Sequence, residues 1–293
     1  MPDSANDLPN FDELWDYNQP GETEARFQEL LPLAEAHPAY HAELLTQIAR
    51  TQGLQRQFEE AHATLDGVKA MLTPDMGRAK ARYLLERGRV YNSSQQKSLA
   101  QPLFQAAWQA AQVCGEDYFA VDAAHMLAIV APPEEALRWN LQALALAEES
   151  QSPRARNWLG SLYNNIGWTY HDEGEYSRAL DYFEKARDWR EEQGQEQEAR
   201  IARWCVARAL RSLERIAEAY QLQLELLGEY QALGEDSGYV NEELGECLLL
   251  MGNPEEASAF FHTAHEILSK DPWLAEAEPE RIERLRRLGE EAA

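Results

Sequence analysis

The sequence is poor in residues that favour β-strands. Valine, isoleucine and threonine together number only 21 of 293 residues, whereas alanine and leucine number 43 and 37. β-Branched side chains suit a pleated sheet, while alanine and leucine are among the best helix formers. The composition therefore predicts an all-α fold. Because 44% of the residues are hydrophobic, the chain can build a core and is not expected to be disordered.

Basic residues are also in the minority. The chain has 27 Lys and Arg against 51 Asp and Glu, a net charge of −24 at pH 7. The imbalance is uniform, because residues 1–150 hold 22 acids and 11 bases and residues 151–293 hold 29 and 16. General binding to nucleic acid requires a basic face that neutralises phosphates. We therefore expect no nucleic-acid partner.

Cysteines and long apolar runs are scarce. Cys114, Cys205 and Cys247 are odd in number and far apart, which does not suit a disulfide framework. The chain opens without a charged-then-apolar leader, and no apolar run approaches the roughly 18 residues that span a bilayer. We expect a reduced cytoplasmic protein without membrane contact, its cysteines acting as small buried hydrophobes.

Motifs of common enzymes and metal sites are missing as well. The sequence contains no phosphate loop, no nucleophile elbow and no H-E-x-x-H motif. His262 and His265, three residues apart, have no evident carboxylate or thiolate that would complete a metal site. His171-Asp172 resembles an acid–base pair, but it precedes a turn at Gly174, where polar residues are usual. We predict no enzymatic activity, no catalytic residue, no metal ligand and no cofactor.

What the sequence does contain is a repeated ladder of small and large residues. Three strong copies begin at Gly88, Gly167 and Gly245. Each is followed by Tyr or Leu at +3, Ala at +12, Phe at +16 and Ala at +19. Weaker copies begin at Ala49, Ala124 and Ala207. We call these six small residues the marker residues; the gaps between them are 39, 36, 43, 40 and 38 residues.

Each copy is expected to form two antiparallel helices. The marker residue lets the second helix approach closely, and the large residues fill the space between neighbouring pairs. Turn signals separate the helices of a pair, as at Gly174 and Gly252-Asn253-Pro254, and Gly194 and Gly234 separate one pair from the next.

The ladder resembles the tetratricopeptide repeat (TPR) family, in its variant with about 40 residues per unit. The resemblance covers roughly residues 40–270 and implies an α-solenoid, a right-handed superhelix of six to seven antiparallel helix pairs. We expect one domain over residues 11–290 after a disordered tail at residues 1–10. The expected units lie near residues 11–38, 40–74, 77–115, 117–151, 154–195, 197–235 and 237–270, with a capping helix at 273–290.

The resemblance implies that the first helix of each pair lines a binding groove. Family members commonly contact the backbone of a bound peptide through an asparagine two residues before the marker, which is Asn165 here, with Asn164 beside it. Trp168 and Trp204 are expected to face inward as flat anchors. The alternatives are that Asn165 bonds a neighbouring helix and that both tryptophans pack along their helices. The other six tryptophans, Trp273 among them, are expected in the core or between repeats.

A column of arginines follows the marker residues. Arg50, Arg89 and Arg208 each come directly after a marker, and Arg211 lies one turn beyond Arg208. His125 takes the same place in a weaker copy. Guanidinium groups bind carboxylates with paired hydrogen bonds, which favours a peptide ligand of mixed acidic and hydrophobic character. The alternative is that these arginines pair internally with Glu86, Asp122 or Glu243.

The sequence thus predicts a non-enzymatic scaffold that holds a protein or peptide partner in its groove. A second hypothesis is a peptide-sensing regulatory domain, similar to the repeat regions of bacterial peptide-sensing regulators, although no helix-turn-helix segment precedes the repeats here. A third is an enzyme on an α-helical scaffold. The identity of the partner and the oligomeric state do not follow from the sequence.

Overall fold

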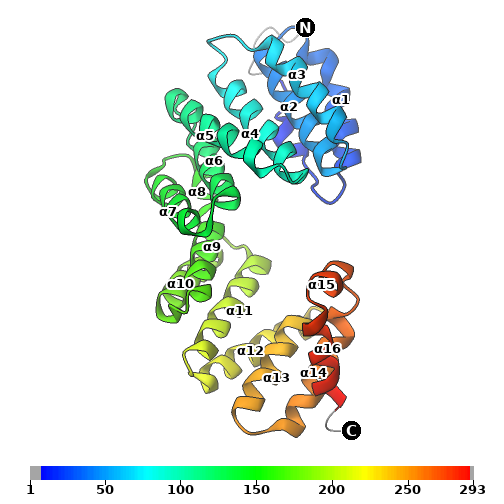
Figure 1. Cartoon of the computed structure of the whole chain (residues 1–293), viewed down its shortest axis with the longest axis vertical. Coiled ribbons are helices and arrows are strands. Elements are labelled where there is room, and N and C mark those ends of the chain that lie inside the picture. The colour runs from blue at the N-terminus through cyan, green and yellow to red at the C-terminus, as the bar shows by residue number, and fades with distance from the viewer. Residues whose placement is uncertain (1–7, 291–293) are drawn as a thin grey trace. The chain divides into compact units, whose positions relative to one another are not determined.

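The part of the chain that the structure describes is helical throughout. A computed structural model describes residues 8–290, which form helices joined by short turns and contain no strand (Figure 1). The predicted all-α fold is therefore confirmed. Residues 1–7 of the expected tail lie outside the described range. Between residues 8 and 290, no helix is long and apolar enough to cross a membrane.

The chain divides into two compact units, Met1–Trp158 (unit 1) and Leu159–Ala293 (unit 2). Unit 1 contains η2 (Phe11–Leu14), α1 (Pro20–Ala34), α2 (Pro38–Leu54), α3 (Phe58–Met71), α4 (Gly77–Ser93), α5 (Lys97–Cys114), α6 (Asp117–Val130), α7 (Pro133–Glu149) and α8 (Pro153–Arg156). Unit 2 contains α9 (Leu159–Asp172), α10 (Tyr176–Glu192), α11 (Glu196–Ser212), α12 (Ile216–Ala232), α13 (Gly238–Leu250), α14 (Pro254–Leu268), α15 (Pro272–Ala277) and α16 (Pro279–Glu290). The single domain expected over residues 11–290 stays a prediction.

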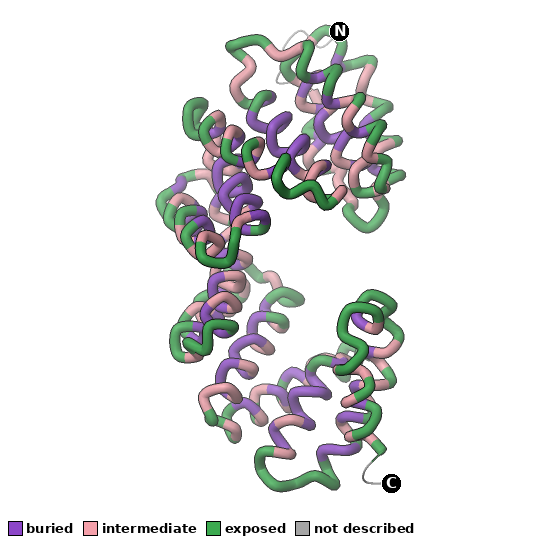
Figure 2. Tube along the Cα trace, in the orientation of Figure 1, coloured by how far each residue is buried: buried purple, intermediate pink, exposed green. Residues whose placement is uncertain are grey.

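Every marker residue lies on the first helix of a pair. These first helices are α2, α4 and α6 in unit 1 and α9, α11 and α13 in unit 2. Buried residues are most frequent along several of them, and the second helices keep exposed sides (Figure 2). A first helix packs against its own partner and also against the neighbouring pair, so most of its surface is removed from water.

Five turns within pairs share one backbone geometry. The residue seven positions after the marker has a positive φ, between 61° and 81°; these residues are Arg56, Gln95, Gly174, Glu214 and Gly252. At Gly174, the backbone N–H of Glu175 donates to Tyr170 O at 2.8 Å, and the N–H of Gly174 donates to His171 O at 3.0 Å. This is the Schellman arrangement that ends a helix. The turn between α6 and α7 differs, because Ala131 there is extended and two prolines follow it.

The glycine markers allow direct contact between the helices of a pair. A Cβ atom on Gly167 would lie 2.5 Å from Cε1 of Phe183, and one on Gly88 would lie 2.5 Å from Cε1 of Phe104. Both phenylalanines are fully buried. Where the marker is alanine, the residue sixteen positions on is not phenylalanine; these residues are Leu65, Asn140 and Gln223. A bulkier marker is thus matched by a different residue opposite it.

Two of those replacements are buried polar side chains. Gln223 is fully buried, and neither of its amide atoms has a hydrogen-bond partner. Asn140 is buried, and its Oδ1 is also unbonded. A polar side chain thus takes the place of phenylalanine in the Ala124 and Ala207 pairs.

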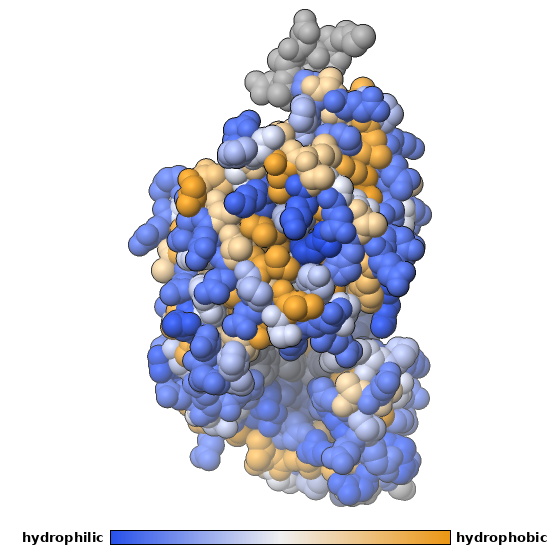
Figure 3. Space-filling model, turned by 45° about the horizontal axis from the view of Figure 1, so that its top comes forward, coloured by the Kyte–Doolittle hydropathy of each residue, from blue (hydrophilic) through white to orange (hydrophobic). Residues whose placement is uncertain are grey.

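Several residue classes can be checked against their exposure. The face in Figure 3 is mainly hydrophilic, and hydrophobic residues form smaller groups on it. Trp273 is 70% exposed, so its expected place in the core was wrong. Cys205 and Cys247 are buried as expected, but Cys114 is exposed at the end of α5.

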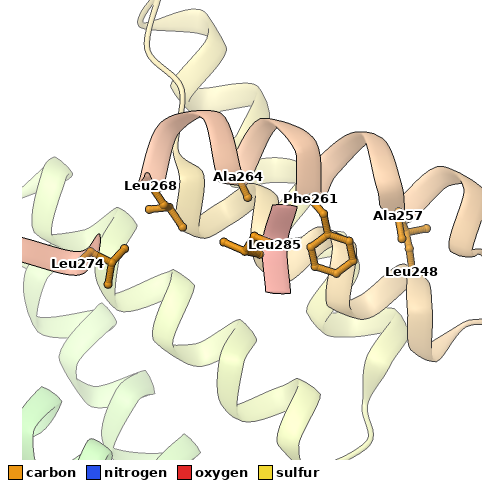
Figure 4. Packing of buried hydrophobic residues seen from close by; sticks show 7 residues of the cluster. All are labelled: Leu248, Ala257, Phe261, Ala264, Leu268, Leu274 and Leu285. Atoms are coloured by element: carbon orange, nitrogen blue, oxygen red, sulfur yellow. The ribbon is translucent and has the colours of Figure 1, made fainter. Parts of the chain in front are cut away.

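The C-terminal part of unit 2 forms two helices where one capping helix was expected. The break falls at Glu278, because Pro279 begins α16 and lacks the amide that would continue α15. Leu285 of α16 is fully buried and lies beside Phe261 and Ala264 of α14 (Figure 4). The helix α16 therefore covers an apolar surface of the last repeat pair.

Candidate functional site

The first helices of each unit present side chains at two recurring places, two residues before the marker and one residue after it. We call the surface that carries these residues the inner face. In unit 1 it comprises Gln47, Arg50, Glu86, Arg89, Asp122 and His125. In unit 2 it comprises Asn165, Trp168, Cys205, Arg208, Glu243 and Glu246.

Each predicted arginine of the column forms an ion pair with the next repeat. Arg50 Nη1 lies 3.2 Å from Glu86 Oε1, and Arg89 bonds Asp122. Arg208 Nε lies 3.3 Å from Glu243 Oε1. In all three cases the arginine after one marker meets the carboxylate two residues before the next marker. The internal pairing considered as the alternative to ligand binding is therefore present in the structure.

The pairs around Glu86 are deeply buried. Its side chain is 4% exposed and accepts from Arg50 and, at 2.8 Å, from Arg89. Burial acts to lower the pKa of Arg89, but the carboxylates of Asp122 and Glu86 raise it above its usual range. Arg89 thus stays charged and is held in place, as a link between repeats.

In unit 2, Arg208 and Arg211 both contact the carboxylate of Glu243, but they do so unequally. Arg211 makes a two-pronged contact with Glu243, at 2.7 Å from Nε and 2.9 Å from Nη2. Burial acts to lower the pKa of Arg211, but these bonds raise it. Arg208 has one longer contact with Glu243 and donates from Nη1 to Ser212 Oγ at 3.1 Å, and burial lowers its pKa despite Glu243. Arg208 is therefore the less satisfied cation of the two.

A row of aromatic rings crosses the inner face of unit 2. The ring centroids of Trp168 and Trp204 lie 6.0 Å apart, and those of Trp204 and Tyr239 are also 6.0 Å apart. The three rings come from α9, α11 and α13. Both tryptophans are partly exposed, and Tyr239 is 40% exposed. The structure thus brings the two predicted tryptophans together and adds Tyr239, which the sequence analysis did not select.

The predicted asparagines lie beside a hollow on the same unit. Asn164 and Asn165 line it together with Ser161 and Arg190, and its volume is about 170 Å³. Asn164 Oδ1 accepts from the Cys205 thiol at 3.3 Å. Arg190 Nη2 donates to Ser161 Oγ at 2.9 Å. Amides, a hydroxyl and a guanidinium therefore line this hollow, which suits the polar main chain of a peptide.

The two inner histidines are partly or wholly buried. The rings of His125 and Trp158 lie 5.0 Å apart, and burial together with Arg89 lowers the pKa of His125 despite Asp122. Burial and Arg208 lower the pKa of His171 in the same way. Both side chains are therefore neutral at pH 7.

His171 also lies next to a serine, which raises the question of nucleophilic catalysis. Its Nε2 is 3.0 Å from Ser212 Oγ. The Ser212 hydroxyl donates to Arg208 O at 3.1 Å and accepts from Arg208 Nη1 at 3.1 Å, so it is held by the arginine of its own helix. Asp172 is 3.9 Å from Nδ1 and 78% exposed, too far and too well solvated to orient the ring. This arrangement serves the fold and does not form a catalytic triad.

The described residues also bear on metal binding and on thiol chemistry. Across residues 8–290, no three His, Cys, Asp or Glu side chains gather as a metal site requires. Burial raises the pKa of the Cys205 thiol to about 12. It also raises the pKa of Cys247 to about 12, with help from Glu243. Neither thiol is an activated nucleophile.

A segment before α1 lies on the inner face of unit 1, and the sequence analysis missed it. We call residues 9–17, which include η2, the leading segment. Trp15 Nε1 donates to Gln47 Oε1 at 3.0 Å. The Arg50 guanidinium lies 5.6 Å from the Trp15 ring and 5.3 Å from the Tyr17 ring. Trp15, expected as a core or inter-repeat residue, thus covers part of the inner face.

The same segment carries a carboxylate to two distant arginines. Asp12 bonds Arg82 of α4, and its Oδ2 lies 2.7 Å from Arg154 Nη1 of α8. Burial acts to raise the pKa of Asp12, but Arg82 and Arg154 lower it below its usual range. The repeat register gave no signal for this contact, because the residues six positions before the other markers are not arginine; they are Glu43, Tyr118, Ser161, Ile201 and Tyr239.

Comparison with known families agrees with the repeat ladder. The model of the tetratricopeptide repeat family matches residues 119–192. This range runs from α6 into α10 and contains the markers Ala124 and Gly167. The resemblance to the TPR family that the motifs indicated is confirmed. No curated protein matches the chain.

Solved structures share the fold at low sequence identity. One is a Signal Transduction ATPase with Numerous Domains protein with a tetratricopeptide repeat sensor, from Pyrococcus horikoshii, with TM-score 0.71 and 16% identity over 94% of this chain and 44% of that one. RapI in its apo form gives TM-score 0.71 and 13% identity over 94% and 84% of the two chains. The apo form of the quorum sensor NprR from B. thuringiensis gives TM-score 0.60 and 17% identity over 92% of this chain and 81% of that one. The chain spans less than half of the first of these proteins. The matches confirm the α-solenoid fold.

Proposed function

We propose that the protein is a non-enzymatic scaffold that binds an extended peptide on the inner face of unit 2. The observation that supports this most strongly is the row formed by Trp168, Trp204 and Tyr239. Partly exposed aromatic rings on three successive first helices offer a large contact area at a low cost in side-chain entropy.

Polar groups beside the row have the right chemistry for a peptide. Asn164 and Asn165 can donate to and accept from main-chain groups. Arg208, the less satisfied partner of Glu243, is placed to donate hydrogen bonds to a carboxylate of the ligand. Because Trp204 and Arg208 are four residues apart on one helix, they lie on the same side of α11. We therefore propose a ligand with an aromatic or aliphatic anchor close to an acidic residue.

The unit 1 residues of the predicted column have a different role in this proposal. Arg89 is 15% exposed and bonded to two carboxylates, and Arg50 contacts Glu86 and the rings of the leading segment. We assign both to holding repeats together. His125 packs against Trp158 and is not assigned a ligand.

The experiment is affinity capture of partners from a native lysate, followed by binding measurements on the partner peptide. The double variant Trp168→Ala/Trp204→Ala should weaken binding at least tenfold, and Arg208→Glu should weaken it and reduce its salt dependence. Arg215→Glu serves as the matched control, because Arg215 is exposed before α12 and pairs with Glu218. Equal binding by the inner-face and control variants would contradict the assignment.

A peptide-sensing domain is the second candidate. The solved proteins of similar fold include one with a repeat sensor and one quorum sensor. This role requires that the peptide changes the arrangement of the helices. Small-angle scattering with and without the bound peptide distinguishes the two roles, because a plain scaffold keeps its scattering profile and a sensor changes it.

A further inference from the structure

We propose that the inner face of unit 1 is a second peptide site, which recognises an aromatic residue followed directly by aspartate and by tryptophan three residues later. The leading segment carries this motif as Phe11, Asp12 and Trp15 and occupies the site in place of a partner peptide. The proposal concerns unit 1 and rests on the proposed function only in taking inner faces as peptide-binding faces.

The centre of the site is a buried cation. The Arg82 side chain is 3% exposed, and its guanidinium lies 5.0 Å from the Phe11 ring and 5.2 Å from the Phe119 ring. It bonds Asp12 and, at 3.1 Å, Glu43. A guanidinium held between two rings and open toward one carboxylate selects an acidic side chain at a fixed place.

A second arginine strengthens the preference for aspartate. Arg154 of α8 lies 3.9 Å from the centre of the Tyr118 ring and bonds the Asp12 carboxylate. Without Asp12, the buried Arg82 would keep Glu43, whose side chain is 12% exposed, and Arg154, whose side chain is 42% exposed, would lose this ion pair. An uncompensated buried charge is costly. The site therefore favours a second carboxylate beside Arg82, whether from this chain or from a partner.

The aromatic residues define the spacing of the motif. Phe11 is 5% exposed and packs edge-on against Phe27 and Tyr40, at 6.3 Å and 5.1 Å between ring centres. Trp15 contacts Phe27 at 5.3 Å and is capped by Arg50. The turn of 3₁₀-helix in η2 places both rings on one side and Asp12 between the two arginines.

The leading segment is attached like a ligand. Its main chain contacts the helices through side chains, as in the bond from Tyr40 Oη to Pro9 O at 2.9 Å and the bond from Asp16 N to Thr23 Oγ1 at 3.1 Å. Glu13 and Tyr17 are exposed. A segment with one short helical turn and few main-chain bonds opens at a lower cost than the repeats beneath it.

The inner face continues past the end of the segment. A hollow of about 150 Å³ borders Arg50, which also contacts Tyr17, and it is lined by Glu86, Arg89 and Met126. A partner peptide that displaces the segment can extend into this hollow and gain contacts that the segment does not make. These extra contacts would offset the advantage that covalent attachment gives to the leading segment.

Covalent attachment gives the leading segment a large advantage over a free peptide of the same sequence. A short tether gives the leading segment an effective concentration of about 1 mM. For a peptide that binds the open site with a Kd of about 10 μM, such a competitor weakens the apparent affinity about 100-fold. Weakening the segment should therefore expose the site to added peptide.

The test uses the full chain and a fluorescent synthetic peptide with the sequence of residues 8–19. We expect the variant Asp12→Ala/Trp15→Ala to bind this peptide at least tenfold more tightly than the unchanged protein, measured by fluorescence anisotropy. A peptide with Asp12→Lys should bind neither protein. Adding Arg154→Glu to the double variant should weaken the binding of the unchanged peptide. Adding Trp168→Ala/Trp204→Ala to the double variant should leave its affinity for the unchanged peptide unaffected. This result separates the unit 1 site from the one proposed in unit 2.

A second measurement covers the case in which the double variant does not fold. Hydrogen exchange of the unchanged protein at millimolar peptide should show faster exchange of the amides at residues 11–17, because the added peptide releases them. If the peptide neither binds the folded variant nor speeds this exchange, the leading segment is a fixed part of the fold and the proposal is wrong. Equal affinity for the variant and the unchanged protein would also overturn it.

Discussion

At the level of single residues, the ion pairs between repeats hold the first helices in register. Arg89 and Asp122 are nearly buried and belong to neighbouring pairs, so each repeat supplies the charge that its neighbour needs. The same rule joins Arg208 to Glu243 in unit 2. Charges of this kind stabilise the fold only together, because either one alone would be buried without compensation.

We expect Asp122→Ala to lower the free energy of unfolding by about 3 kcal/mol, because it leaves the buried Arg89 with Glu86 alone. Urea unfolding monitored by circular dichroism measures this loss. Glu283→Ala is the matched control, since its partner Arg286 is at the surface, and it should change the midpoint little. Similar losses in both variants would show that burial of the Arg89–Asp122 pair does not increase its contribution to the free energy of unfolding.

Histidine burial predicts a dependence of stability on pH. The pKa values of His125 and His171 are lowered in the fold by burial, from an ordinary value of 6.5. The unfolded chain therefore binds more protons than the folded one as the pH falls below about 6.5, so the fold loses stability there. Urea midpoints at pH 7.5 and 5.5 should differ in this direction. The difference should shrink in His125→Gln/His171→Gln, and an unchanged difference would assign the effect to other groups.

At the level of helices, the marker residues and their partners sixteen positions on form matched pairs. Gly167 faces Phe183, whereas Ala49 is followed at the same distance by Leu65. The match explains why the weaker copies are still well-formed pairs. An alanine marker removes the space for a phenylalanine ring, and a smaller residue takes its place.

A double-mutant cycle tests this matching. Gly167→Ala should cost about 1–3 kcal/mol, because the new Cβ would lie 2.5 Å from Phe183. The variant Gly167→Ala/Phe183→Leu should lose at least about 1 kcal/mol less than the sum of its single changes. Gly228→Ala is the control, since its Cβ would meet no atom within 4 Å, and it should gain stability from helix propensity. Additive losses would show that the two positions are independent.

The turns within pairs offer a stabilising change. Glu214 has φ 61° in a turn whose equivalents include Gly174 and Gly252. Glu214→Gly should raise the free energy of unfolding by about 0.5–1 kcal/mol, because glycine adopts this conformation without strain. Gln221→Gly within α12 should lower it by about 1 kcal/mol. Thermal unfolding compares the two, and a loss of stability in the turn variant would mean that its side chain has a role of its own.

The sequence predicted the elements better than it predicted the partners of each residue. Helix pairs and inner-face columns follow from a local period, so the markers Gly88 and Gly167 were sufficient to place Arg89 and Trp168. The contact between Asp12 and Arg154 joins residues 142 positions apart and follows from no period. The break at Pro279 was missed although a proline inside an expected helix is a signal for a break.

At the level of the whole molecule, the excess of acids sets how salt affects stability. Unit 1 has 22 acids and 13 bases, and unit 2 has 29 acids and 14 bases. Most of this excess is on the surface, where repulsion is screened over a Debye length of about 10 Å at 0.1 M salt. Buried pairs such as Arg89 and Asp122 are screened much less.

We therefore expect the midpoint of thermal unfolding to rise when sodium chloride is increased from 0.05 M to 0.5 M, since screening relieves the repulsion between acids. Differential scanning fluorimetry over a salt series measures the shift. The same series with sodium sulfate separates screening from general salting-out effects. A falling midpoint in sodium chloride would show that surface ion pairs contribute more than the net charge.

The placement of the three cysteines gives the protein built-in sites for chemical labelling. Cys114 in unit 1 is exposed, so a maleimide dye at mild pH should attach there alone and leave the inner face of unit 2 unmodified. Cys205 and Cys247 are buried on α11 and α13, two of the helices that carry the aromatic row. Their rate of modification by a thiol reagent therefore reports how often unit 2 opens. A bound peptide that stabilises this face should slow that rate without any engineered probe.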